Sequence, residues 1–182
     1  MSSPSAIDAL LRHYESGEYF SRLINHPAPH RLRQAPVLVY HARLNAVEPR
    51  FTIVMPTFNH ESNVEDSLDA AATAASLPFD CIIVDDGSDD GTVDRATSFF
   101  ESGRYPLVTG ATIVRNPVPV YETACDNLGF ALAETEIVVE VQADIQIREP
   151  AFDALFLRAS ATSPAPSAIS GRCVKSFVGM SS

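Results

Sequence analysis

Two adjacent aspartates, Asp85 and Asp86, stand in a short turn that directly follows a run of apolar residues. If that run is a strand, both carboxylates leave it at its open end. A carboxylate there accepts a hydrogen bond from a ring N–H of a base or from a ribose hydroxyl. Helix capping explains little about these two positions, so we predict that Asp85 and Asp86 bind a ligand.

The rest of the same turn is rich in glycine and aspartate. Gly87 and Gly91 permit tight backbone turns, including turns with positive φ. Asp89 and Asp90 come just before an expected helix, where carboxylates accept hydrogen bonds from free N–H groups. We expect these two aspartates to cap that helix.

A second polar cluster, Pro56-Thr57-Phe58-Asn59, ends another apolar run. Thr57 offers a hydroxyl, and Phe58 either stacks on a base or packs in the core. The cluster contains no glycine, and the chain has neither a Gly-x-Gly-x-x-Gly motif nor a Gly-Lys-Ser/Thr loop. These features disfavour a dinucleotide-binding domain, a P-loop NTPase and a nucleotidyltransferase.

A third cluster, Gln142-Ala143-Asp144, follows the apolar run that ends at Val141. A divalent cation bound to a diphosphate needs at least one protein carboxylate, while phosphate oxygens and water complete its shell. Asp144 is the candidate for that carboxylate. Glu122 and Asp126, four residues apart on an expected helix, either border the same pocket or, as we expect, form a solvated acidic face.

Alternating strands and helices must position these clusters. The pattern predicts strands at 51–55, 80–84, within 107–115, at 136–141 and near 168–170, and helices at 62–76, 92–101, around 121–132 and at 149–161. Ser62 and Glu65 have the spacing of a capping box for the first of these helices. The alternation is typical of an α/β fold, a mostly parallel sheet with helices on both faces. In such sheets ligands bind beyond the carboxyl ends of the strands, where all three clusters fall.

Residues 1–50 differ from this pattern. Helical spacing of apolar side chains predicts a first helix at 5–24, with Ile7, Leu10, Leu11 and Tyr14 on one face. Prolines at positions 27, 29 and 36 then indicate a connecting segment. We therefore divide the chain into residues 1–50, an N-terminal helix with a connecting segment, and residues 51–182, the main domain.

Composition limits the partners and the location. The formal net charge is −10 and the isoelectric point about 4.8, so the protein repels phosphate backbones and nucleic-acid binding is not expected. A divalent cation held by carboxylates would still allow a phosphate-bearing small ligand to bind. Cys81, Cys125 and Cys173 have no metal-site or disulfide spacing, and no apolar run reaches the length of a membrane span. We expect reduced thiols in a cytoplasmic protein.

Residues 53–59 and 82–92 together resemble the opening of family-2 glycosyltransferases with the GT-A fold. Asn127-x-Gly129 and Gln142-Ala143-Asp144 fall where that family has its Asn-x-Gly and Asp-x-Asp segments, and the resemblance covers residues 51–171. It implies transfer of a sugar, with inversion, from a nucleotide-diphospho-sugar donor to an acceptor that the sequence does not identify (a glycan, lipid or protein). It also implies a divalent cation, Mn²⁺ or Mg²⁺.

The resemblance assigns the nucleoside pocket to residues of the first two clusters, namely Pro56, Thr57, Phe58, Asp85 and Asp86. Among them, Asp86 would bind the base. Asp144 matches the last Asp of Asp-x-Asp and would coordinate the cation. Gln142 stands where the family usually has the first Asp, which weakens the expectation of tight metal binding. Its amide would instead contact the ribose or the donor sugar.

Inversion also needs a base that deprotonates the acceptor hydroxyl. In the family this base is an Asp or Glu well after Asp-x-Asp, but residues 145–182 contain only Glu149 and Asp153, both on an expected helix. We therefore expect a chain that carries the donor half, is truncated at its C-terminus and has no identifiable catalytic base. The alternative is a catalytically incomplete nucleotide-sugar-binding module.

Overall fold

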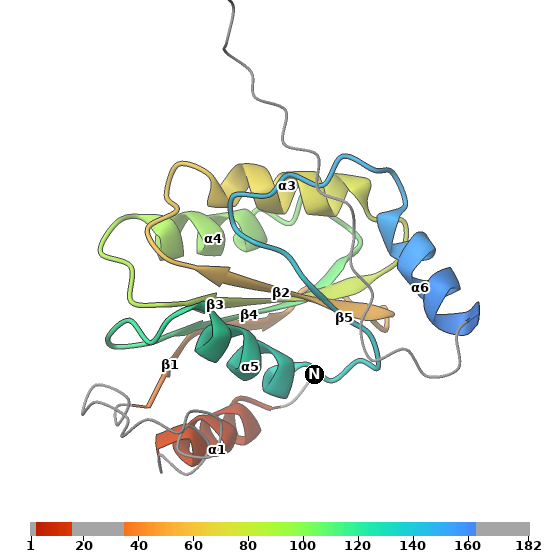
Figure 1. The fold of residues 1–182 in the computed structure, drawn as a ribbon. Coiled ribbons are helices and arrows are strands. Elements are labelled where there is room, and N and C mark those ends of the chain that lie inside the picture. Colours follow the sequence, from red (N-terminus) through yellow and green to blue (C-terminus); the bar gives the residue numbers. More distant parts are fainter. Residues whose placement is uncertain (1–2, 16–34, 163–182) are drawn as a thin grey trace, which may run out of the picture.

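The computed structural model describes residues 3–15 and 35–162. Within them, one sheet has the strand order β1-β4-β3-β2-β5, and helices cover both of its faces (Figure 1). The strands are β1 (Val37–Arg43), β2 (Phe51–Thr57), β3 (Phe79–Asp85), β4 (Val108–Arg115) and β5 (Val138–Glu140). The helices are α1 (Pro4–Glu15), α3 (Val64–Ala74), α4 (Thr92–Glu101), α5 (Glu122–Leu132) and α6 (Phe152–Thr162).

The sheet is mostly parallel, as predicted. β2 pairs in parallel with both β3 and β5, and β3 pairs in parallel with β4. Among the described strands, only β1 runs antiparallel to its neighbour, along the outer edge of β4. A central parallel sheet is covered on both faces, which explains why every position of β2 and β3 is buried.

β1 is an element that the sequence pattern did not predict. It lies in the expected connecting segment, yet it pairs with β4 from Val37 opposite Arg115 to Arg43 opposite Gly110. The run from Val37 to Tyr40 is rich in β-branched and aromatic residues, a strand signal that the neighbouring prolines obscured. β1 thus joins part of residues 1–50 to the main sheet, and the division at residue 50 stays a prediction.

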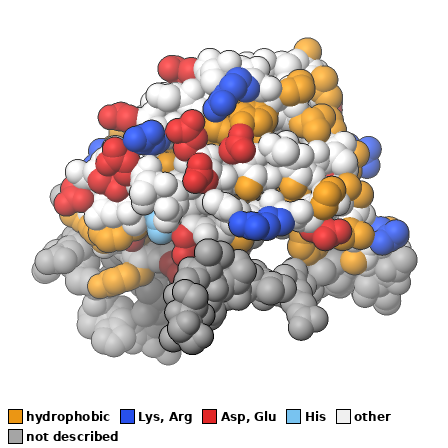
Figure 2. All heavy atoms as spheres, turned by 90° about the horizontal axis from the view of Figure 1, so that it is seen from above, with side chains coloured by type: hydrophobic (Ala, Val, Ile, Leu, Met, Phe, Trp, Pro, Cys, Tyr) orange, Lys and Arg blue, Asp and Glu red, His pale blue; other side chains and the backbone are white. Residues whose placement is uncertain are grey.

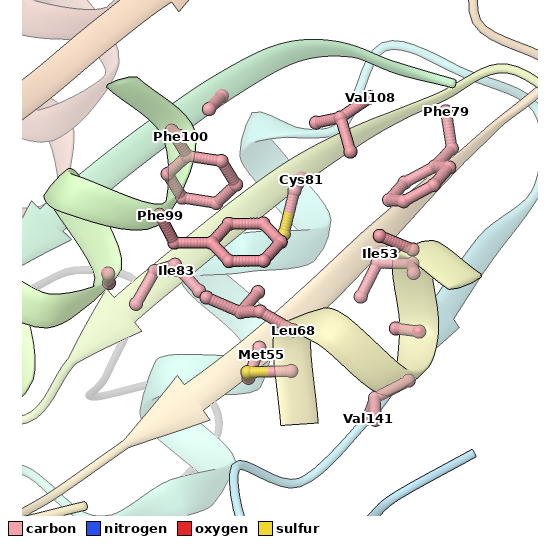
Figure 3. Close-up of a cluster of buried hydrophobic side chains, with 14 of the residues drawn as sticks. Ile53, Met55, Leu68, Phe79, Cys81, Ile83, Phe99, Phe100, Val108 and Val141 are labelled. Carbon is pink, nitrogen blue, oxygen red and sulfur yellow. The ribbon is translucent and has the colours of Figure 1, made fainter. Parts of the chain in front are cut away.

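One face of the sheet is covered by α3 and α4, which enclose the larger of two core clusters (Figure 3). Phe99 and Phe100 of α4 and Leu68 of α3 point onto this face. There they meet side chains such as Cys81 and Ile83 of β3. Each fully buried apolar side chain of this size stabilises the fold by about 1.5–3 kcal/mol.

The opposite face is covered by α5, with α1 beside it (Figure 1). Gly129 of α5 lies so close to β2 that a Cβ at this position would be 2.3 Å from Cγ1 of Val54. Ile7 and Leu11 of α1 join the same cluster. The helix predicted at 5–24 is therefore confirmed up to residue 15, and its remainder lies outside the described residues.

Two other elements differ from their predicted bounds. β5 is shorter than the strand predicted at 136–141, although the N–H of Val141 still donates to the carbonyl of Val54 (2.9 Å). α6 begins at Phe152 and not at residue 149, because Ala151 has a φ of +56°, which an α-helix does not contain. The strand predicted near 168–170 lies outside the described residues.

The capping box predicted at Ser62 and Glu65 is wrong. Asn63 is the N-cap of α3 and makes no side-chain capping hydrogen bond. The hydroxyl of Ser62 instead donates to Oδ1 of Asn63 (3.1 Å). Glu65 forms ion pairs with Arg95 (3.6 Å) and Arg104 (3.5 Å). These pairs link α3 to α4 and to the segment that follows α4. Figure 2 shows the molecule from the side that α3 and α4 cover, where acidic and basic side chains lie together.

The predictions made from composition can be compared with the described residues. Cys81 and Cys125 are free and buried, which confirms the prediction for these two thiols, while Cys173 lies outside the described residues. Within the described part of the chain, no helix combines the length and the apolar character needed to cross a membrane. The cytoplasmic location stays a prediction.

Candidate functional site

The carboxyl ends of β3, β2 and β5 lie side by side at one edge of the sheet, and a predicted polar cluster follows each of them. β2 pairs with β3 as far as Thr57 and Asp85. On its other side, β2 pairs with β5 as far as Val54 and Glu140. The structure therefore brings together residues 56–59, 85–88 and 142–144.

Asp85 has no exposed surface and is held by contacts within the protein. Its carboxylate accepts hydrogen bonds from the N–H of Ser88 (3.1 Å), from the Ser88 hydroxyl and from the hydroxyl of the buried Thr57 (3.3 Å). Nε of Arg115 lies 3.3 Å from its Oδ2. A buried carboxylate requires such partners. Asp85 thus holds the turn in shape, and a contact with a ligand stays a prediction.

Asp86 exposes 7% of its surface and faces the segment that leads into α5. Its carboxylate accepts hydrogen bonds from the amide of Asn116 (3.0 Å) and from the backbone N–H groups of Val120 (2.7 Å) and Tyr121 (2.9 Å). An ionised carboxylate offers about four lone-pair sites. The thiol of Cys125 is a further hydrogen-bond partner of this carboxylate, so a contact of Asp86 with a ligand stays a prediction.

The glycines of the Asp-rich turn behave differently from each other. Gly87 has a φ of +80°, and a Cβ there would lie 3.2 Å from the carbonyl oxygen of Asn116. Gly91 has a φ of −79° and is the N-cap of α4, so it does not use positive φ. Asp90 acts at this helix start as predicted, because its Oδ1 accepts a hydrogen bond from the N–H of Thr92 (3.0 Å).

Phe58 projects from the end of β2 with 47% of its surface exposed, so it does not pack in the core. The preceding Pro56 is buried in β2. After Phe58, Asn59 has a φ of +55°, a conformation that asparagine tolerates. The N–H of Asn59 donates to the hydroxyl of Ser88 (2.9 Å), and its Oδ1 accepts from the N–H of Asp89 (2.9 Å). These two bonds fix the backbone that carries the Phe58 ring.

Gln142, after the end of β5, is held by two glutamates. Its Nε2 donates to Oε1 of Glu122 (2.6 Å) and to Oε1 of Glu140 (2.9 Å). Both N–H bonds of the amide are then in use, so Gln142 offers a ligand hydroxyl its Oε1 as an acceptor. Asp144 lies two residues further along and is exposed.

The acidic side chains of α5 do not form a purely solvated face, contrary to the expectation from sequence. Oδ1 of Asp126 is buried and has no hydrogen-bond partner within the part of the chain that the structure describes. Burial, and then the charges of Glu140 and Glu122, raise the pKa of Asp126 to about 6. Burial and the charge of Glu122 also raise the pKa of Glu140. The region beside Gln142 therefore carries concentrated negative charge at neutral pH.

Asp144 is the candidate ligand for a divalent cation at this edge of the sheet. Among residues 3–15 and 35–162, no group of three or more His, Cys, Asp or Glu side chains is placed to hold a metal ion. Asp144 supplies a single exposed carboxylate. Mg²⁺ is commonly held by one or two carboxylates together with substrate phosphates and water. The chain thus fits a cation that is shared with a diphosphate.

The sequence-based prediction lacked two residues of this site, Arg115 and Asn116 at the end of β4. Arg115 pairs with Asp85 and donates to the carbonyl of Ser88. The Asn116 amide reaches Asp86. Their place in the sequence was a signal that could have identified them. They stand at the carboxyl end of a strand that lies beside β3 in a parallel sheet.

Solved structures share this fold. S. aureus TarS, residues 1–349, in complex with UDP is similar with a TM-score of 0.52 and 21% identity, over 62% of this chain and 33% of that chain. The same protein in complex with UDP-GlcNAc is similar with a TM-score of 0.50 and 21% identity, over 60% of this chain and 30% of that chain. The chain thus spans about a third of the length of these structures. The likeness confirms the predicted fold class, a GT-A-like, mostly parallel sheet flanked by helices.

Comparison by sequence gives two results. Among curated proteins, none matches the chain. A family model described as glycosyl transferase family 2 matches residues 52–167, a stretch that contains all three polar clusters at the sheet edge. Because this match spans more than half of the 182 residues, the protein belongs to glycosyl transferase family 2.

Proposed function

We propose that this chain binds a nucleotide-diphospho-sugar and forms the donor half of an inverting glycosyltransferase. One observation supports the proposal most strongly. The exposed ring of Phe58, the carboxylate of Asp86 and the exposed carboxylate of Asp144 follow three adjacent strands at one edge of the sheet. A donor of this class needs an aromatic surface and an acceptor for its base, and a cation ligand near its diphosphate.

In the proposed complex, the base stacks on Phe58 and donates a ring N–H to the carboxylate of Asp86. The Asn116 amide holds the Asp86 carboxylate in place for this contact. Pro56 and Thr57 form the buried support beneath Phe58. Asp85 is enclosed and lies beside the nucleoside. It contributes to binding indirectly, because its hydrogen bonds keep the turn in the conformation that positions Asp86.

The diphosphate and sugar lie toward β5 in this proposal. Asp144 holds Mn²⁺ or Mg²⁺ together with the phosphate oxygens. When bound, the cation stabilises the negative charge of the leaving diphosphate. Gln142 accepts a hydrogen bond from a ribose or sugar hydroxyl, and Glu122 and Glu140 orient its amide.

A second candidate function is donor binding without transfer. Asp153, one of two acidic residues after Asp144, is buried and accepts hydrogen bonds from the N–H groups of Ser76 (3.0 Å) and Leu77 (2.7 Å). This carboxylate fixes the chain after α3 and is occupied by that role. Asp153 is therefore not free to act as the base that activates the acceptor, be it a glycan, lipid or protein, and this observation is the reason for the second candidate.

Calorimetry with UDP and GDP, each with and without Mn²⁺, tests the donor site. UDP is the first probe because TarS, which shares the fold, has been solved with UDP and with UDP-GlcNAc. We expect Mn²⁺ to strengthen nucleotide binding in the wild type and in Asp94→Asn, an exposed position of α4, and not in Asp144→Asn. Equal dependence on Mn²⁺ in both variants would contradict the role of Asp144. Release of free nucleotide from a bound donor would favour the enzyme over the binding module.

A further inference from the structure

We propose that Tyr121 provides a second aromatic surface for the base of the donor, in addition to Phe58. The inference rests on the proposed function, because it concerns how the same site recognises its ligand. It assigns to the chain a preference for ligands that carry a flat heteroaromatic ring over ligands that carry a diphosphate alone.

Tyr121 has a strained backbone. Its φ is 74° and its ψ is 159°, a region that is occupied almost only by glycine. The other described non-glycine residues with positive φ are Asn59 and Ala151, whose φ values of 55° and 56° fall in the left-handed helical range that L residues visit. Strain of the Tyr121 kind persists where surrounding contacts impose it, and it is concentrated at ligand sites.

The contacts that impose this conformation include the candidate base-binding carboxylate. The N–H of Tyr121 donates to Oδ2 of Asp86 (2.9 Å), and the N–H of Val120 donates to Oδ1 (2.7 Å). On the other side, the carbonyl of Tyr121 accepts hydrogen bonds from the N–H groups of Ala124 (3.1 Å) and Cys125 (3.3 Å) in the first turn of α5. The backbone is thus held at both ends, and the side chain leaves it directly beside Asp86.

The ring itself is not part of the core. Tyr121 exposes 82% of its surface, more than any other large hydrophobic residue in the described part of the chain. Phe58 exposes 47% and follows Thr57, whose carbonyl accepts the N–H of Asp86 (2.8 Å). Two exposed aromatic side chains therefore start next to the same carboxylate, one from the end of β2 and one from the start of α5.

Because the Tyr121 ring is exposed and its backbone is strained, this residue does not stabilise the fold. Binding of a base would explain why a tyrosine occupies this position. Every base has a π-face, so an aromatic ring adds affinity whichever base the donor carries. Asp86 then supplies the hydrogen bond at the ring edge. Tyr121 acts as a contact residue for the base and takes no part in sugar transfer.

Calorimetry on the full chain in Mn²⁺, with UDP, GDP and inorganic pyrophosphate as probes, tests the inference in three variants. Tyr121→Phe keeps the ring, Tyr121→Ala removes the ring and keeps the strain, and Tyr121→Gly removes both. We expect Tyr121→Phe to bind the nucleotides like the wild type. The other two variants should bind them about 5- to 150-fold more weakly, the range for loss of one base–aromatic stack, with pyrophosphate binding unchanged. Tyr121→Gly should also unfold about 2–4 °C higher, because the strain is relieved.

The outcomes separate this inference from the donor site itself. Equal nucleotide affinity in all four proteins would overturn the role of Tyr121 and leave the donor site standing. A loss that is the same for pyrophosphate as for UDP would also overturn it, because the ring would then not act through the base. Failure of the folded wild type to bind either nucleotide would reject the donor site, and the inference with it.

Discussion

At the scale of single residues, the buried charge of Asp85 is balanced by Arg115, which lies at the surface. Its carboxylate is fully buried, whereas Arg115, which supplies the opposite charge, is 45% exposed. Ser88 and Thr57 supply hydrogen-bond donors but no charge. Removing one member of such a pair leaves a buried charge without compensation, which costs more than the pair itself contributes.

We therefore expect Arg115→Met to lower the free energy of unfolding by about 1–2 kcal/mol, less than for a fully buried pair because solvent screens the guanidinium. Arg95→Met is the matched control, since the Arg95 side chain is 52% exposed and pairs with Glu61 and Glu65, whose side chains are 47% and 45% exposed. Its loss should cost less than about 1 kcal/mol. Urea denaturation measures both variants, and equal losses would show that Asp85 does not need Arg115.

Asp126 makes stability depend on pH. Burial, and then the charges of Glu140 and Glu122, raise its pKa from the ordinary 3.8 to about 6 in the folded protein. Between these values the folded state binds more protons than the unfolded state, so the free energy of unfolding falls as the pH rises from about 4 to about 6. The destabilising effect of the ionised carboxylate is therefore complete above about pH 6 and absent below about pH 4.

Asp126→Asn removes this titration. We expect the variant to be more stable than the wild type at pH 7 and to match it near pH 4, because the neutral amide mimics the protonated carboxyl. Urea midpoints at the two pH values measure the difference, with Asp94→Asn as the exposed control. A gain of equal size at both pH values would mean that ionisation of Asp126 is not the cause.

At the scale of elements, the position of α5 depends on the absence of a side chain at Gly129. In a helix interior, alanine is favoured over glycine by about 1 kcal/mol. A Cβ here would however lie 2.3 Å from Cγ1 of Val54, which is completely buried in β2. Overpacking of a core costs about 1–3 kcal/mol and occasionally more. At this distance we expect the clash to outweigh the gain in helix propensity.

Gly129→Ala should therefore destabilise the protein by about 1 kcal/mol or more in urea denaturation. Val54→Ala, which removes the clashing methyl groups, provides the test of the cause. In the Val54→Ala background, the same Gly129→Ala change should be neutral or stabilising, so the double-mutant cycle should show a favourable coupling of about 1 kcal/mol or more. Strict additivity would place the cost elsewhere in α5.

Sequence patterns predicted the central elements well because burial on both faces leaves a clear signal. β2 and β3 each contain a continuous apolar run, 53–56 and 81–84, and α4 spans the predicted residues 92–101. β1 escaped prediction because prolines precede it and because, among the described strands, it pairs on one side only, with β4. The capping box at Ser62 failed because Glu65 is used in ion pairs with arginines distant in sequence.

The candidate site was predictable only where it follows a strand closely. The candidates Phe58 and Asp86 directly follow β2 and β3, while Asp144 comes shortly after the end of β5. The contact of Asn116 with Asp86 depends on the order of strands in the sheet, which hydrophobic period does not reveal. The positive φ of Tyr121 results from hydrogen bonds to Asp86 across the fold, and nothing in the local sequence indicates it.

At the scale of the whole molecule, one sheet supports two core layers. Cys81 lies in the layer under α3 and α4, and Cys125 lies in the layer under α5. β2 and β3 contribute side chains to both layers. Loss of either layer would therefore expose one face of both strands to water. We infer that the two layers unfold as one cooperative unit.

The two buried thiols can test this cooperativity. Burial raises the pKa of both, and the thiolate is the reactive form, so neither thiol reacts quickly until the fold opens. In a Cys173→Ser background, variants that keep only Cys81 or only Cys125 should react with a thiol reagent at the same protected rate. The free energy of opening derived from that rate should equal the free energy of unfolding from urea, provided that reclosing is faster than labelling. Much faster labelling of Cys125 than of Cys81 would show that α5 opens by itself. The candidate base site would then open with α5, because Asp86 is hydrogen-bonded to the segment that leads into this helix.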